Sequence, residues 1–300
     1  MSKTQKPVSF IAAAATILAA IMLYDVMSAI VKHLSKDYPA PQLAMLRNLI
    51  GMVPTAVILF LSKDWIGTGK PVVIRQWKLA VFRGVLGVFA QICFYLAVFH
   101  LEFATAVAIV FAGPFFVTLL SIPILGHRVR LWRWLAVLVG FTGVLLVIRP
   151  TADSFTWYAL LPLCAALGFA STSVTSQLFD KTVPTALINL YANVASLIGT
   201  FALVLLTTGF VPIIELEHWL WIGVMGLAGG LASFCMISAY RLAEPSSLSP
   251  FEYFGIPFSF FLGWYFFAEA PLDRLIPGVF LIIGGGLLII WREHYQKANR

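Results

Sequence analysis

The chain has 300 residues, of which 60% are hydrophobic and only 11% are charged. A soluble protein of this size carries roughly a quarter charged residues, and a mean hydropathy of +0.92 leaves too few polar side chains to cover a water-facing surface. The composition therefore excludes a soluble domain and indicates a protein whose solvent is the lipid bilayer. The net charge of +7 does not indicate nucleic-acid binding, because the basic residues stand at the ends of apolar runs rather than on one face.

Apolar runs of membrane-spanning length recur along the chain and predict ten transmembrane helices. In chain order they cover residues 9–34, 41–62, 78–99, 103–126, 131–149, 155–179, 184–207, 217–241, 246–268 and 273–291. The first run begins like a signal peptide but continues to Leu34 without an evident processing point, so we interpret it as the first membrane helix. The connections are short and leave no room for a soluble domain.

The basic residues of the connections predict the orientation in the membrane. With a cytoplasmic N-terminus, the inner side collects Lys3, Lys6, Lys63, Lys70, Arg75, Lys78, Arg128, Arg130, Arg133, Lys181, Arg241, Arg292, Lys297 and Arg300. The outer side then receives only Lys32, Lys36, Arg149 and Arg274. This imbalance predicts a multi-pass protein of the plasma membrane, of the bacterial inner-membrane type, with both termini in the cytoplasm.

The sequence repeats itself after about 141 residues. Leu101 matches Leu242 and Gly143 matches Gly284 without a gap. The repeat predicts two domains of five spans each, residues 1–149 and 150–300. Because five is odd, the second half is inverted relative to the first, which is typical of transporters whose binding site lies between the halves. The predicted fold class is therefore an all-α integral membrane protein with ten transmembrane helices in two inverted five-helix repeats.

Several motifs resemble those of the EamA-type permeases of the drug/metabolite transporter superfamily. They are Met45-Leu-Arg-Asn-Leu-Ile50, Phe82-Arg-Gly-Val-Leu-Gly87, Tyr95-Leu-Ala-Val-Phe-His-Leu101, Trp134-Leu-Ala-Val-Leu-Val-Gly-Phe-Thr-Gly-Val-Leu-Leu-Val-Ile148, Ile237-Ser-Ala-Tyr-Arg-Leu-Ala243 and Ala268-Glu-Ala-Pro271. The resemblance covers essentially the whole chain. One departure is Gly126-His127, where the family commonly has Gly-Glu.

The resemblance implies that spans one to four and six to nine surround a central cavity. Spans three, four, eight and nine would line most of it, and spans five and ten would be peripheral, where a homodimer contact could form. The branches that carry vitamins or nucleoside-containing metabolites, such as riboflavin and S-adenosylmethionine carriers, look closer than the sugar-phosphate or small multidrug branches.

Asp25 and Arg47 are ionisable residues inside predicted spans, where a charge costs free energy unless it is paired or hydrated. At 1.5 Å per residue they lie at comparable depth in the outer halves of spans one and two. This favours a mutual ion pair beside the cavity. The alternatives are that Arg47 reaches the outer headgroups and that Asp25 faces water alone.

Glu252 lies between Pro250 and Pro257 in span nine. Proline removes a backbone donor and frees a carbonyl, so Pro250 and Pro257 should distort this span where it lines the cavity, as Pro114 should in span four. We predict conformational hinges at these three prolines. Arg83 either joins Glu252 at the cytoplasmic side of the cavity or reaches the inner interface.

Polar and aromatic side chains on the other lining spans complete the predicted solute site. Gln91 and Tyr95 lie one turn apart on span three and share a face. The predicted substrate-binding residues are Asp25, Arg47, Gln91, Tyr95, Phe111, Asn193, Ser233, Tyr240, Glu252 and Tyr253. The hydroxyl-rich run Ser171–Gln177 and the GxxxG pair Gly226 and Gly230 are more typical of helix packing.

No catalytic residues, metal site or cofactor are predicted. Cys93, Cys164 and Cys235 lack metal-ligand spacing, the histidines fall at span ends, and no nucleotide-binding motif occurs. We predict a secondary active or facilitative transporter, not an enzyme, that moves a small vitamin-like, nucleoside-like or amino-acid-like metabolite by alternating access. The alternative within the fold is a proton-coupled multidrug or amino-acid exporter. An intramembrane enzyme would need a catalytic set, and a channel would need a filter, which the sequence does not offer.

Overall fold

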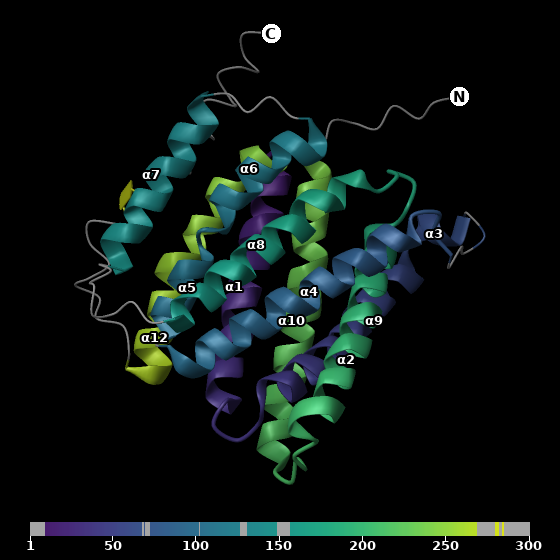
Figure 1. The fold of residues 1–300 in the computed structure, drawn as a ribbon. Coiled ribbons are helices and arrows are strands. Elements are labelled where there is room, and N and C mark those ends of the chain that lie inside the picture. The colour runs from purple at the N-terminus through teal and green to yellow at the C-terminus, as the bar shows by residue number, and fades with distance from the viewer. Residues whose placement is uncertain are drawn as a thin grey trace.

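The computed structural model describes residues 10–67, 69, 73–101, 103–126, 131–148, 157–268, 280–281 and 284. Helices dominate this part of the chain (Figure 1), as expected where backbone polar groups must be satisfied within each segment. In the first half they are α1 (Phe10–Leu34), α2 (Ala40–Leu61), the short α3 (Lys63–Gly67), α4 (Trp77–His100), α5 (Phe103–Val110), α6 (Gly113–Leu125) and α7 (Leu131–Ile148).

The second half continues with a further series of helices. They are η2 (Trp157–Ala159), α8 (Leu160–Thr175), η3 (Ser176–Leu178), α9 (Thr185–Leu203), the π-helical η4 (Val204–Thr208), α10 (Leu216–Leu242), α11 (Pro245–Leu248), η5 (Ser249–Phe254) and α12 (Gly255–Phe267). Among the described residues, six helical segments are long and apolar enough to cross a membrane, and they correspond to predicted spans one, two, three, six, seven and eight. Predicted span ten lies largely outside the described residues.

Spans four and nine are not the single helices that the sequence predicts. Span four is interrupted at Phe111 and Ala112, between α5 and α6. Span nine consists of α11, the 3₁₀ segment η5 and α12. Pro114 stands in the first turn of α6, and Pro250 in that of η5, positions where a missing N–H costs little. Pro257 is the third residue of α12. All three prolines thus stand at or just after an interruption, while their role as hinges stays a prediction.

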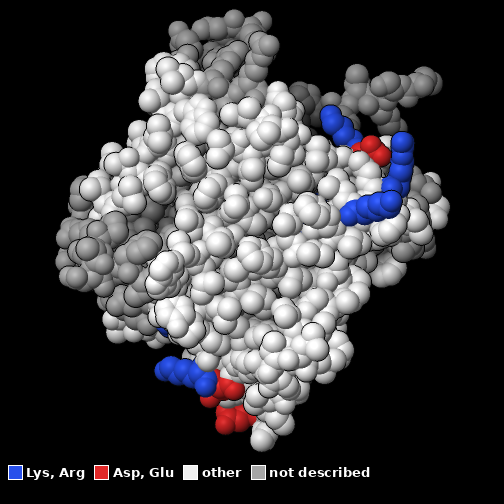
Figure 2. Space-filling view, viewed as in Figure 1, with Lys and Arg blue, Asp and Glu red and all other residues white. Residues whose placement is uncertain are grey.

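Helix α2 shows how the bundle meets the bilayer. Leu49, Val53 and Val57 recur at helical spacing and are about half exposed, whereas Asn48 and Thr55 on the other side are fully buried. This pattern reverses that of a soluble helix, because the apolar stripe faces lipid and the polar side chains find partners inside. Figure 2 shows a corresponding distribution on one face of the molecule, with charged side chains at two opposite edges and a broad uncharged band between them.

Helices from opposite halves of the chain pack most extensively on one another. Helix α10 packs against α1 and α2, and α4 packs against α8 and α9. Helix α7 packs against α5, α6 and η5 and stands at one edge of the bundle in Figure 1, consistent with the peripheral place expected for span five. Helices of both halves therefore surround the space at the centre of the bundle.

Two glycines allow the closest of these helix contacts. A Cβ built on Gly230 would lie 2.6 Å from the Cα of Gly51, and one built on Gly226 would overlap the side chain of Ile50. The packing interpretation of the GxxxG pair is thus confirmed, because α2 and α10 approach through backbone rather than side chains.

The replacement Gly230→Ala should lower the stability of the bundle by about 2 kcal/mol, the usual scale of overpacking, because backbone atoms of Gly51 cannot move aside. The readout is the melting temperature of the detergent-solubilised protein. Gly223→Ala on the same helix is the matched control, since a Cβ there meets nothing within 4 Å. Equal melting of the two variants would contradict the proposed contact.

Candidate functional site

A cavity of about 220 Å³ lies in the middle of the bundle. Side chains from α1, α2, α4, α5, α6, α8, α9, α10 and η5 line it, so both halves contribute. Its apolar walls include Phe94, Phe111 and Phe169, and polar groups interrupt them at a few places. A mostly apolar cavity with few polar groups is the usual form of a small-molecule site.

Arg47 and Asp25 do not form the ion pair that the sequence predicts. The Arg47 guanidinium donates through Nη2 to Gly229 O at 2.9 Å and to Ser233 Oγ at 2.7 Å, both on α10. Its Nη1 donates to Asn48 Oδ1 at 2.8 Å. Comparable depth in two helices does not fix the direction of their side chains, and Arg47 turns toward α10 instead of α1. It does not reach the headgroups either, because it is buried.

Asp25 faces the cavity from α1 beside the start of α12. It is 5% exposed, and its Oδ2 has no hydrogen-bond partner. A Cβ on Gly255 would stand 3.0 Å from this oxygen, so the backbone of α12 approaches the carboxylate closely. Glu252 lies one 3₁₀ turn before Gly255, on η5, and accepts a hydrogen bond from the Tyr240 hydroxyl. The interrupted span nine thus brings a second carboxylate to the same wall.

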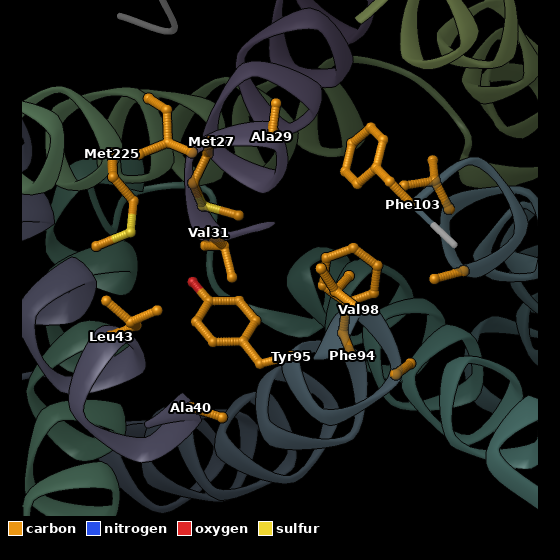
Figure 3. Packing of buried hydrophobic residues seen from close by; sticks show 14 of the residues in the cluster. Met27, Ala29, Val31, Ala40, Leu43, Phe94, Tyr95, Val98, Phe103 and Met225 are labelled. Atoms are coloured by element: carbon orange, nitrogen blue, oxygen red, sulfur yellow. The ribbon is translucent and has the colours of Figure 1, made fainter. Parts of the chain in front are cut away.

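Gln91 and Tyr95 meet on α4 as predicted. The Gln91 amide donates to the Tyr95 hydroxyl at 3.2 Å, and Gln91 Oε1 accepts from Asn48 Nδ2 at 3.1 Å. In Figure 3 the Tyr95 ring extends from α4 toward Leu43 and Val31. Tyr95, Leu43 and Val31 belong to the largest apolar cluster of the described chain, which includes residues where α1 ends and α2 begins.

Two hydrogen-bonded contacts lie at the same end of the bundle, where α1 ends and α2 begins. The Gln42 side-chain amide donates to Val211 O at 2.8 Å, and its oxygen accepts from Val211 N at 2.8 Å. The Tyr38 hydroxyl lies 2.7 Å from His218 Nδ1. Both contacts join the first half of the chain to the second.

Arg83 and Asn193 line the cavity from α4 and α9. Arg83 is 3% exposed and donates through Nε and Nη2 to Thr172 O, at 3.1 and 2.9 Å, while its Nη1 has no partner. The interface placement considered for Arg83 is therefore wrong. Asn193 is 4% exposed, and its Nδ2 also has no partner.

Among the described residues, four buried side-chain atoms lack any hydrogen-bond partner: Asp25 Oδ2, Arg47 Nε, Arg83 Nη1 and Asn193 Nδ2. All four belong to residues that line this one cavity. Buried polar groups are normally satisfied. Arg47 Nε packs against α10 at Gly229, so the unpartnered atoms of Asp25, Arg83 and Asn193 are those that indicate a place where another molecule completes the bonding.

Eight of the ten predicted binding residues line the cavity: Asp25, Arg47, Gln91, Tyr95, Phe111, Asn193, Ser233 and Glu252. Tyr240 and Tyr253 do not line the cavity. The Tyr240 hydroxyl donates a hydrogen bond to Glu252, and the Tyr253 hydroxyl donates to Val137 O of α7. A solute contact by either tyrosine stays a prediction.

Several lining residues do not belong to the predicted binding set. They are Arg83, Tyr24, Phe94 and Phe169. Helical spacing could have found Phe94, one turn before Val98 and beside Tyr95 on the same span. The hydroxyl run of α8 bonds back to its own carbonyls, as in Thr175 Oγ1 to Ser171 O at 2.7 Å, which supports the packing interpretation.

Within the part of the chain that the structure describes, no three His, Cys, Asp or Glu side chains lie close enough together to hold a metal ion. The three cysteines are free, and Cys164 is exposed on the outside of α8. His127, His294 and Glu269 lie outside the described residues.

An apolar helical bundle with a partly polar cavity lined by both halves of the chain is the form of a membrane protein that binds a small molecule between its helices. The sequence model of the EamA-like transporter family matches residues 10–149 and again residues 156–291. The chain therefore belongs to the EamA-like transporter family, and it is a transporter and not an enzyme.

Curated relatives carry different solutes. A riboflavin transporter of Brucella anthropi is 32% identical over 221 residues, which cover 73% of this chain and 78% of the relative. The pseudopaline exporter CntI of Pseudomonas aeruginosa is 29% identical over 270 residues, 89% of each chain. An S-adenosylmethionine uptake transporter of Rickettsia prowazekii is 24% identical and covers 92% of this chain and 90% of its own. A solved crystal structure at 21% identity shares the fold, with a TM-score of 0.75 over 92% of this chain and 95% of that one.

The replacement Ser233→Ala should destabilise the protein by about 1–3 kcal/mol, because it leaves a buried guanidinium N–H without its acceptor and removes the partner of the Tyr24 hydroxyl. Thermal unfolding in detergent measures this. Ser238→Ala, on the same helix but outside this network, is the control. A Ser233 variant that melts with the wild type would show that Arg47 is held by its other bonds alone.

Proposed function

We propose that this transporter moves a small organic metabolite across the bacterial inner membrane by alternating access at the central cavity. The observation that carries the proposal is the gathering of every unpartnered buried polar side-chain atom of the described chain around that one space. The solute is a vitamin-like, nucleoside-like or amino-acid-like compound. Transport is facilitative or driven by a solute or ion gradient, with Asp25 and Glu252 as the cavity carboxylates able to carry a proton.

The proposal includes ten membrane helices in two inverted repeats, residues 1–149 and 150–300. The two interrupted spans support it, because α6 and α12 have 13 residues each and begin 142 positions apart, at Gly113 and Gly255. Both end on a residue in the left-handed conformation, Gly126 at φ 67° and Ala268 at φ 53°. Asn48 of α2 and Asn189 of α9, which are 141 positions apart, each donate an amide N–H to another helix.

An inverted pair of halves gives alternating access a simple physical basis. When the two halves exchange conformations, the end of the cavity that is closed exchanges as well. The apolar cluster and the contacts of Gln42 and Tyr38 close the present outer end in the proposed orientation, in which both termini are cytoplasmic. A homodimer through α7 and span ten is a part of this proposal that rests on the resemblance alone.

Counterflow in proteoliposomes tests the proposal. Vesicles loaded with unlabelled riboflavin, S-adenosylmethionine or a mixture of amino acids should accumulate the labelled form of the solute that the protein carries, with and without a proton gradient. Accumulation that saturates with concentration excludes an open pore.

The replacement Val110→Trp should reduce this counterflow at least tenfold, roughly the effect of losing 1.4 kcal/mol, because the indole fills the cavity that Val110 lines. Leu119→Trp is the matched control, since Leu119 lies on α6 with its side chain exposed to the lipid band. Equal transport by the two variants would place the solute path elsewhere.

A further inference from the structure

We propose that the solute is zwitterionic, with its cationic group against Asp25 and its anionic group against Arg83 and Asn193. The inference rests on the proposed function and names the class of solute for the same cavity. It follows from the sign and the position of the unpartnered groups, which divide the cavity into an acidic wall and a donor wall.

The acidic wall is formed by α1 and η5. Asp25 Oδ2 is buried, accepts no hydrogen bond and forms no ion pair. Gly255 lets the start of α12 pack closely on this wall, since a Cβ there would overlap Ile21 Cγ2 and stand 2.6 Å from the Phe111 ring. Glu252 adds a second carboxylate, whose Oε2 lies 3.7 Å from the position of a Cβ on Gly113. A cation that reaches this wall meets two acids and an aromatic ring.

The donor wall is formed by α4 and α9. Gly84, next to Arg83, lies so close to Ala192 and Ala195 that a Cβ on it would overlap Ala195, which brings Arg83 and Asn193 to neighbouring positions on two touching helices. Thr172 O holds two of the guanidinium nitrogens and thereby fixes the third, Nη1, which is left free. A guanidinium N–H and an amide N–H together suit a carboxylate or another anionic oxygen.

Arg47 is not part of the donor wall. Its Nε packs into the notch of α10 at Gly229, where a Cβ would stand 2.5 Å from Nε and 2.7 Å from Met27 Sδ. The guanidinium is thus committed to the contact between α2 and α10.

Asp25 Oδ2 and Arg83 Nη1 have no partner in the protein. A buried charge without a counter-charge costs several kcal/mol, so each of the two groups is best compensated when a group of opposite charge reaches it. A solute with a single charge satisfies one wall and leaves the other unpaired, and an uncharged solute leaves both. Only a solute that carries both charges compensates the two walls at once. Selection by unpaired groups of this kind discriminates more strongly than apolar contact.

Two matched series of solutes test the inference in the counterflow assay. One is phenylalanine, its methyl ester, N-acetylphenylalanine and the N-acetyl amide; the other is 4-(aminomethyl)benzoate with its methyl ester and N-acetyl derivative, whose charges stand farther apart. S-adenosylmethionine and the uncharged riboflavin are included. We expect zwitterions to compete at about tenfold lower concentration than their singly charged or neutral analogues, the effect of about 1.4 kcal/mol.

Two variants should shift this preference in opposite directions. In Asp25→Asn, the zwitterion should no longer compete at a lower concentration than the anionic N-acetyl analogue. In Arg83→Gln, it should no longer compete at a lower concentration than the cationic ester. The order in which the solute analogues compete for counterflow by the wild-type protein tests the inference even if a variant does not fold.

Equal competition by a singly charged analogue, or transport of riboflavin without any zwitterion, would overturn the inference and leave the proposed transport function intact. Counterflow of none of these compounds would count against both.

Discussion

The contact between α2 and α10 is the constraint on which the rest of the structure depends. Gly51 and Gly230 bring the two backbones together, and Arg47 fixes their register through Gly229 and Ser233. Lipid offers no hydrophobic driving force between helices, so close packing and interhelical hydrogen bonds have to supply the association. Because α2 and α10 belong to different halves, this one contact joins the two halves of the chain along a shared seam.

The cavity exists because other helices depart from that tight packing. Spans four and nine are interrupted beside the cavity, and the irregular segment of each contributes a lining residue: Phe111 in one half and Glu252 in the other. These two residues are 141 positions apart. Equivalent positions of the two repeats therefore carry an aromatic ring in the first half and a carboxylate in the second. The site is asymmetric although the two halves of the chain are related.

Much of this arrangement could be predicted from the sequence. Apolar runs located six long helices to within a few residues, the GxxxG pair indicated its packing role, and helical spacing placed Gln91 beside Tyr95. The partner of Arg47 could not be predicted, since depth along a helix leaves the direction around its axis open. The burial of Arg83 depends on Thr172 O, a backbone acceptor that no side-chain pattern reveals. The breaks in spans four and nine needed the fold around them, because proline permits an interruption without fixing where it falls.

The pair of hydrogen bonds between the Gln42 side chain and the backbone of residue 211 has an evolutionary consequence. Both hydrogen bonds go to the backbone N–H and C=O of Val211, so the side chain at that position takes no part in them. Any amino acid with a free N–H preserves the pair, and proline alone removes the donor. Substitutions can thus accumulate at position 211 among descendants of this protein without opening that end of the bundle, while position 42 requires a side-chain amide.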